Sequence, residues 1–157
     1  MTRSITIGEL LDQQRVATDS GITSKKRLME LLSELIADAA PDLGGNEVLN
    51  SLLRRERLGS TGLGRGVALP HGRLAEIDRA MGAFVKLEKP IDYDAMDGMP
   101  VDLVFALVVP EKATEGHLEI LARLAEKLGN QTTCEQLRAA ANPAEACEIL
   151  CQEAPDS

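Results

Sequence analysis

Residues 101–109 read Val-Asp-Leu-Val-Phe-Ala-Leu-Val-Val and are almost continuously apolar. This composition is typical of a strand that is covered on both faces, because a strand with one face in water alternates apolar and polar residues. Shorter apolar runs at residues 67–69 and 80–87 predict two further strands. The stretch at 101–109 therefore predicts the central strand of a sheet with helices on both of its faces.

Segments before and after these strands have apolar residues at helical spacing. Leucines and isoleucine at positions 28, 31, 32, 35 and 36 predict one amphipathic helix before Pro41. This first helix is expected to start after a cap at Thr23 or Ser24. A second helix is expected over residues 47–58, with Asn46 as its N-cap and Gly59 at its C-terminal end. Two further helices are expected over residues 115–128, capped by Thr114, and over residues 143–151, capped by Asn142. Helices alternating with strands predict an α/β domain, a three-layer sandwich with a mixed sheet between helices.

Composition narrows the classes of function. A chain of 157 residues has the usual length of one domain, and aromatic residues make up only 2% of it, so stacking on bases or sugars is not expected. The formal net charge of −8 argues against nucleic-acid binding, which needs a basic face. No apolar run is long enough to span a membrane, and no signal-like segment opens the chain, so we expect a cytoplasmic protein without membrane insertion.

The three cysteines predict a reducing compartment and no metal site. Cys134, Cys147 and Cys151 are an odd number without a C-x-x-C pair, and no third or fourth ligand lies near Cys147 and Cys151. We expect all three to be small buried apolar side chains.

One window reverses the charge of the chain. Residues 54–73 contain five arginines and one acid, Glu56, together with four closely spaced glycines. Glycines allow backbone N–H groups to approach an anion, although this spacing fits neither the P-loop nor the dinucleotide fingerprint. We expect phosphate-orienting donors from Gly59, Ser60, Thr61, Gly62 and Gly64, and partner docking by Arg54, Arg57, Arg65 and Arg73. The alternative is a solvated charge run between two elements.

His71 is the sharpest candidate in this window. It follows the predicted strand at 67–69 and the rigid Pro70, and Gly72 leaves space beside its ring. A neutral imidazole is nucleophilic and is populated near neutral pH, so His71 can attack a phosphorus atom, with Arg55 or Arg73 offsetting the charge on the oxygens. An ordinary buried or surface histidine is the competing interpretation.

The other histidine, His117, lies in the first turn of the predicted helix at 115–128. It shares an apolar stripe with Leu121, Leu124 and Leu128, which points it toward the sheet near the end of the central strand, where open α/β sheets bind ligands. Spacing alone also fits a core histidine.

Residues 55–72 read Arg-Glu-Arg-Leu-Gly-Ser-Thr-Gly-Leu-Gly-Arg-Gly-Val-Ala-Leu-Pro-His-Gly. This run resembles the signature of enzyme IIA domains of the fructose/mannitol/nitrogen class of the phosphotransferase system (PTS). Further matches lie at residues 24–27, 90–95, 100–103, 105–110 and 117–118. The resemblance implies a single enzyme IIA domain over residues 1–157, with its core at about 5–152, and the mannitol-type enzyme IIA fold.

The same resemblance implies the chemistry. His71 is the phosphorylated histidine, modified at Nε2, His117 is the second active-site histidine, and Arg55 stabilises the phosphoryl charge. The donor is an HPr-like phosphocarrier, and no cofactor takes part. The segment at 92–97 and the lack of a fused membrane domain resemble the nitrogen-regulatory branch, whose targets include potassium-uptake and sensor-kinase proteins. Arg65 departs mildly from the pattern.

Three alternatives remain at this point. A sugar-transport enzyme IIA would pass the phosphoryl group to an enzyme IIB. A phosphohydrolase with a histidine nucleophile is a poorer match, because Pro70 stands where histidine phosphatases have arginine and Glu56 is the only acid in the window. A binding module without chemistry would never carry a covalent label.

Overall fold

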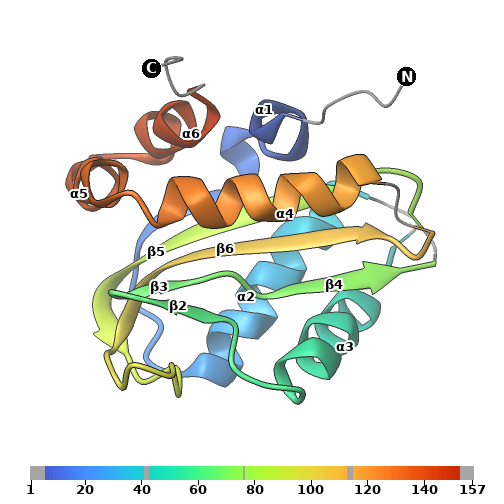
Figure 1. The fold of residues 1–157 in the computed structure, drawn as a ribbon, viewed down its shortest axis with the longest axis horizontal. Coiled ribbons are helices and arrows are strands. Elements are labelled where there is room, and N and C mark those ends of the chain that lie inside the picture. The colour runs from blue at the N-terminus through green and yellow to red at the C-terminus, as the bar shows by residue number, and fades with distance from the viewer. Residues whose placement is uncertain (1–5, 41–42, 76, 113–114, 153–157) are drawn as a thin grey trace.

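The computed structural model describes residues 6–40, 43–75, 77–112 and 115–152. A mixed sheet forms the middle layer, in the order β1-β5-β6-β3-β2, and β4 also pairs with β6 (Figure 1). The strands are β1 Val16–Ser20, β2 Gly62–Gly64, β3 Val67–Ala68, β4 His71–Leu74, β5 Met81–Ile91 and β6 Val101–Pro110.

Helices cover both faces of this sheet. Figure 1 shows α2 and α3 on one face and α4, α5, α6 and α1 on the other. The helices are α1 Ile7–Leu10, α2 Lys25–Asp38, α3 Gly45–Glu56, α4 Glu115–Leu128, α5 Gln131–Ala139 and α6 Pro143–Cys151, and a short 3-10 helix, η1 Gln13–Arg15, precedes β1. The predicted α/β sandwich is confirmed.

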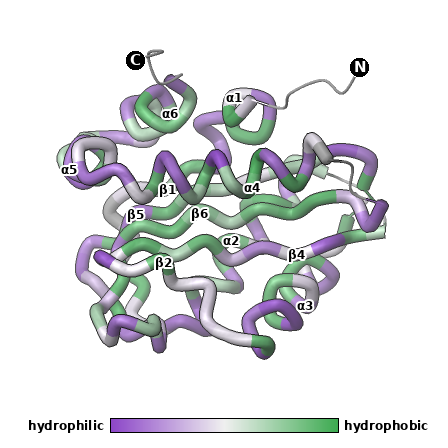
Figure 2. Tube along the Cα trace, in the orientation of Figure 1, coloured by the Kyte–Doolittle hydropathy of each residue, from purple (hydrophilic) through white to green (hydrophobic). Residues whose placement is uncertain are grey.

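β6 is the central strand that its composition predicts. It runs antiparallel to β5 on one side and parallel to β3 and β4 on the other. Every residue of β6 except Asp102 is buried, and the trace of this strand is coloured as hydrophobic over most of its length (Figure 2). Because β3 pairs with the first half of β6 and β4 with the second half, the chain at Leu69 and Pro70 links two short strands. His71 is the first residue after that link.

Two apolar cores lie on the two faces of the sheet. The first contains leucines of α2 and α3, such as Leu32 and Leu52, packed against Val85 and Val104. The second contains Ile120, Leu124 and Leu128 of α4, together with apolar residues of α5 and α6. The burial of both strand faces explains why the longest strands lack polar alternation.

Several helix ends agree with the prediction. Ser24 caps α2 by accepting a hydrogen bond from the Arg27 amide at 3.2 Å, and Asn142 caps α6 by accepting from the Glu145 amide at 2.9 Å. α3 differs from its predicted bounds, because it begins two residues before Glu47 and its N-cap is Gly44, whose amide donates to the Glu47 carboxylate at 3.3 Å. The predicted cap at Asn46 is therefore wrong, and the helix ends at Glu56 rather than near Gly59. The predicted cap Thr114 lies outside the described residues.

The cysteines agree with the prediction in part. Cys134 is buried, but Cys147 and Cys151 on α6 are only half-buried, with their sulfur atoms 4.0 Å apart. Cys147 packs against the second core from its edge.

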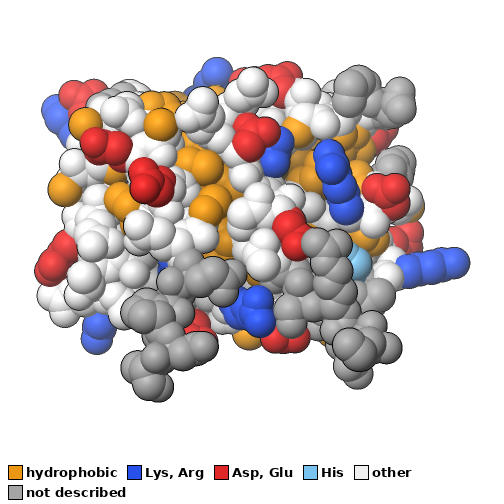
Figure 3. Space-filling model, turned by 90° about the horizontal axis from the view of Figure 1, so that it is seen from above, with side chains coloured by type: hydrophobic (Ala, Val, Ile, Leu, Met, Phe, Trp, Pro, Cys, Tyr) orange, Lys and Arg blue, Asp and Glu red, His pale blue; other side chains and the backbone are white. Residues whose placement is uncertain are grey.

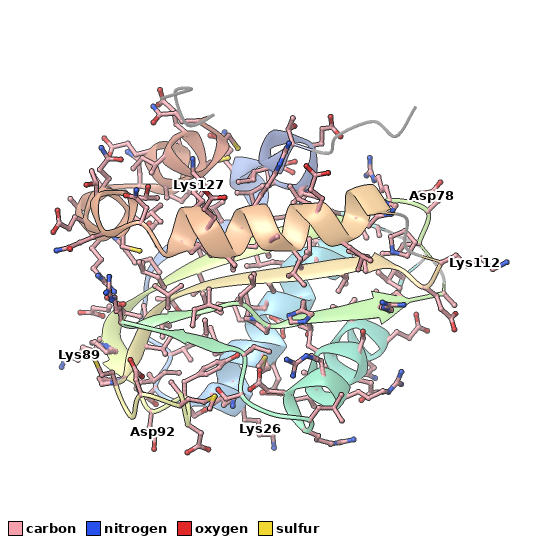
Figure 4. All side chains as sticks on the ribbon, in the orientation of Figure 1. Lys26, Asp78, Lys89, Asp92, Lys112 and Lys127 are labelled. Carbon is pink, nitrogen blue, oxygen red and sulfur yellow. The ribbon has the colours of Figure 1, made fainter. Side chains whose placement is uncertain are left out.

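Most of the charged residues lie on the surface, although Lys86 is buried. Lys26, Lys89 and Lys112 extend away from the domain (Figure 4), and charges of both signs alternate with apolar side chains on the face seen in Figure 3. Within the described residues, no helix combines the length and apolarity needed to cross a membrane.

Candidate active site

A cavity of about 400 Å³ opens between α3, β4, β6 and the start of α4. Both histidines of the chain and three of its arginines border it, above a floor of aliphatic side chains. Its lining residues are Ser51, Arg54, Arg55, Leu58, His71, Gly72, Arg73, Leu107, Val109, His117, Leu118 and Leu121. The fold thus brings together residues that are far apart in the sequence.

The backbone fixes the tautomer of His71. Its Nδ1 lies 2.9 Å from the carbonyl oxygen of Leu69, and a carbonyl can only accept a hydrogen bond. Nδ1 therefore carries the proton of the neutral ring, and Nε2 carries the lone pair. His71 is half-buried and lines the cavity, so Nε2 is the ring nitrogen with a lone pair available there.

The surroundings keep this ring neutral. Burial lowers the pKa of His71, and the positive charge of Arg55 lowers it further, against the opposing effects of the Leu69 carbonyl and the Glu56 carboxylate. The pKa therefore lies below its usual 6.5. At neutral pH the neutral imidazole therefore dominates, and the ring gains a second proton only when the pH falls below that ordinary value.

Gly72 brings α3 against the sheet. A Cβ atom built at Gly72 would lie 2.1 Å from Ser51 Oγ and 2.9 Å from the Ser51 backbone. The Ser51 hydroxyl in turn donates a hydrogen bond to the Arg73 carbonyl at 2.8 Å. The missing side chain of Gly72 thus makes room for the helix that carries Arg54 and Arg55. The expected space beside the histidine ring stays a prediction.

Three arginines reach the cavity from two elements. Arg54 and Arg55 lie in the last turn of α3, and Arg73 lies on β4 two residues after His71. The Arg55 guanidinium donates to the Gly59 carbonyl at 2.9 Å, which orients it at the end of the helix. Of its five N–H donors, this bond occupies one.

His117 borders the cavity from the first turn of α4. The fully buried stripe of this helix is Ile120, Leu124 and Leu128, whereas His117 is half-buried and lies beside that stripe with Leu118 and Leu121. The prediction that His117 points toward the sheet near the end of β6 agrees with its position beside Leu107 and Val109. The two histidines therefore face one cavity.

The glycine-rich loop takes a different position from the one expected. Gly59, Ser60, Thr61, Gly62 and Gly64 are all described, and none of them lines the cavity. The Thr61 amide donates to the Glu56 carboxylate at 3.2 Å, and the Gly62 amide donates to Ser60 Oγ at 3.1 Å. These two amides are engaged elsewhere, and guanidinium groups line the cavity in place of the loop. That the loop orients a phosphate group stays a prediction.

The four arginines predicted to dock a partner do not all lie at the cavity. Arg54 and Arg73 are exposed and line the cavity, whereas Arg57 and Arg65 do not line it. Arg65 lies in the turn between β2 and β3, at the opposite end of the sheet from α3 (Figure 1). Its amide donates to Asp97 and its carbonyl accepts from Arg138, with φ at 57°.

Sequence reasoning missed one part of this region. Glu56, counted only as the single acid of its window, is bound by Lys25, Thr61 and Tyr93.

The described part of the chain contains no cluster of three or more His, Cys, Asp or Glu side chains arranged to hold a metal ion.

Comparison with known proteins supports the resemblance noted at residues 55–72. Residues 9–153 match the family model described as "Phosphoenolpyruvate-dependent sugar phosphotransferase system, EIIA 2". The chain is 43% identical over 148 residues to a nitrogen regulatory protein of Klebsiella oxytoca, covering 94% of this chain and 91% of that protein.

Solved structures agree on the fold. The crystal structure of nitrogen regulatory protein IIA-Ntr from Neisseria meningitidis matches with a TM-score of 0.86 at 43% identity, covering 92% of this chain and 98% of that one. The mannitol IIA of Escherichia coli matches with a TM-score of 0.73, over 89% of this chain and 98% of that one, but at 18% identity it supports the fold alone. The chain belongs to the EIIA 2 family of the phosphoenolpyruvate-dependent phosphotransferase system.

Proposed function

We propose that this protein accepts a phosphoryl group on Nε2 of His71 from the phosphohistidine of an HPr-like carrier in the cytoplasm. The observation that carries the proposal is the hydrogen bond between His71 Nδ1 and the Leu69 carbonyl, which leaves the Nε2 lone pair at the cavity. That lone pair forms the new N–P bond while the bond between phosphorus and the carrier's nitrogen breaks, and the electron pair of the broken bond returns to the carrier's ring. His71 keeps its Nδ1 proton throughout.

The charges around the cavity suit transfer better than hydrolysis. Arg55 and its neighbours offer donors to the phosphoryl oxygens, which favours the charge developed during transfer. The cavity lining, made up of described residues, contains no carboxylate. An alcohol leaving group must be protonated as it departs, and only a histidine of the lining could supply that proton. A phosphohistidine donor that already carries a proton on its second ring nitrogen leaves as a neutral ring without one.

A regulatory role is the branch that the similarities favour. The two compared proteins with 43% identity are both named nitrogen regulatory proteins. In this role the phosphorylation state of His71 is the signal, and target proteins such as potassium-uptake or sensor-kinase proteins read it. The alternative is a sugar-transport enzyme IIA that passes the phosphoryl group to an enzyme IIB.

The proposal is tested by incubating the protein with phosphoenolpyruvate, enzyme I and an HPr-type carrier, followed by intact mass measurement. We expect one added phosphoryl group per chain. An unmodified mass, with the carrier itself phosphorylated, would leave a binding module as the better description. Sustained release of phosphate from small esters would favour a hydrolase.

His117 is expected to assist the transfer without bonding to phosphorus. Replacing His117 by alanine removes one positioned donor at the cavity, so phosphoryl transfer should slow by roughly 10- to 1000-fold while labelling still reaches completion. Rapid-quench kinetics with the phosphorylated carrier measures the rate, and a thermal melt confirms that the variant is folded. A variant as fast as the parent would return His117 to a packing role.

Arg73 is expected to guide the carrier to the cavity, because it is exposed at the rim. Charge reversal by Arg73→Glu should slow association by about tenfold at low ionic strength, with the deficit shrinking as salt rises. Arg65→Glu is the matched control, since the turn that carries Arg65 lies at the opposite end of the sheet. Stopped-flow rates that fall equally in both variants would extend the docking surface to that turn and contradict this assignment.

A further inference from the structure

A nearly buried carboxylate follows Arg55, a residue of the cavity lining, in the chain. Glu56 is the last residue of α3, and its side chain is only 6% exposed. It accepts hydrogen bonds from Lys25 Nζ at 2.9 Å, from the Tyr93 hydroxyl at 3.1 Å and from both the amide and the hydroxyl of Thr61. A carboxylate so buried persists as a charge because donors of this kind surround it.

The donors come from three separate segments. Lys25 opens α2, Thr61 precedes β2, and Tyr93 follows β5. Tyr93 is fully buried, and burial raises the pKa of its phenol, so the hydroxyl stays protonated and donates. Lys25 Nζ also donates to the Tyr93 carbonyl at 3.0 Å and lies 4.2 Å from the centre of its ring. Through Lys25 and Tyr93, Glu56 therefore fastens the end of α3 to two distant parts of the fold, and through Thr61 to the start of β2.

This anchoring closes the turn that holds Arg55. The bonds between Glu56 and Thr61 fix both ends of residues 57–60, and the Gly59 amide donates back to the Glu56 carbonyl at 3.2 Å. The Gly59 carbonyl then accepts from Arg55 Nη1 at 2.9 Å. The direction of the guanidinium thus depends on a turn whose shape depends on Glu56.

We propose that Glu56 is a positioning residue: it holds the turn at residues 57–60 so that the Gly59 carbonyl aims the Arg55 guanidinium into the cavity. Glu56 does not line the cavity, so it acts through Arg55 and does not touch the phosphoryl group. The inference rests on the proposed phosphorylation of His71. It predicts that losing Glu56 and losing Arg55 damage the same step.

A double-mutant cycle tests this coupling. The transfer rate at saturating phosphorylated carrier is measured for the parent, Glu56→Gln, Arg55→Ala and the double variant. Glu56→Gln alone should slow transfer by roughly 10- to 100-fold with little change in the carrier concentration that gives half the maximal rate, because a misaimed group costs rate more than binding. In the Arg55→Ala background the same substitution should have almost no further effect.

Two further variants serve as controls for this interpretation. Arg138→Gln breaks an ion pair of similar length, 2.9 Å to Asp102, which links α5 to β6 away from the cavity, so it should lower stability without slowing transfer. Tyr93→Phe removes one donor to Glu56 and keeps the aromatic ring, so it should slow transfer less than Glu56→Gln does. We expect Tyr93→Phe to fold even if Glu56→Gln does not.

The outcomes separate cleanly. Effects of Glu56→Gln and Arg55→Ala that multiply in the double variant would overturn the positioning role, and so would an equal slowing by Arg138→Gln. If Glu56→Gln does not fold, a Tyr93→Phe variant with the parental rate would overturn it as well. A parent that never becomes labelled on His71 would overturn the proposed function, and the inference with it.

Discussion

Replacing His71 by alanine is expected to abolish phosphorylation completely. The parent should gain one phosphoryl group from the carrier, and the bond should be lost in acid and persist in base, as a phosphoramidate does. The variant should gain none, because the cavity then lacks the nitrogen whose lone pair is fixed by the Leu69 carbonyl. Intact mass measurement before and after acid treatment distinguishes the two.

His117 makes this experiment sharp, since it is the only other histidine and borders the same cavity. His117→Ala is the matched control and should still be labelled to completion. A label that remains on His71→Ala, or one that survives acid, would move the acceptor to another residue and contradict the proposal.

Adding a methyl group at Gly72 is expected to damage both folding and transfer. The Cβ atom of Gly72→Ala would overlap Ser51 Oγ and press on the Ser51 backbone, so α3 must move away from β4. Overpacking of this kind costs about 1–3 kcal/mol of unfolding free energy. The arginines of α3 move with the helix, and we expect transfer to slow by roughly 10- to 100-fold. Urea denaturation and rapid-quench kinetics measure the two effects.

Gly45→Ala is the control for this substitution, because it adds the same methyl group to the first turn of α3. No atom lies within 4 Å of a Cβ built there. Alanine also favours a helix over glycine by up to about 1 kcal/mol, so stability should stay level or rise. Parental stability and rate in Gly72→Ala would show that α3 tolerates the shift and that its close approach to β4 is not required.

The long apolar elements of the fold were predictable from the sequence, and the short polar ones were not. β6 and α2 are buried along one or both faces, so their residue patterns carry the information. β4 reads His-Gly-Arg-Leu and has no strand pattern, and it forms a strand because the second half of β6 offers it a partner. β1, β2, α1 and the nine-residue helix α5 also went unpredicted, because each buries few side chains.

The candidate site was likewise predictable only in part from the sequence. The residue types at positions 55, 71 and 117 suggested phosphoryl chemistry, and the fold places all three at one cavity. The glycines between positions 59 and 66 indicated backbone freedom but not where the amides of this loop point, and the Glu56 carboxylate accepts a hydrogen bond from one of those amides, that of Thr61. The close approach of Gly72 to Ser51 joins residues that are far apart in the sequence, so no local sequence pattern predicts it.

The pairing of β4 with a strand that comes later in the chain has a consequence for biosynthesis. His71 and its flanking arginines are translated before β6 and α4, which supply Leu107, Val109 and His117 to the cavity wall. A nascent chain that has not yet reached residue 101 therefore exposes His71 without the strand that β4 pairs with or the far side of the pocket. If His71 is the phosphoryl acceptor, as we propose, we expect it to become competent only after residues 101–121 have emerged from the ribosome and docked, so the modification would mark only chains that have folded at least this far.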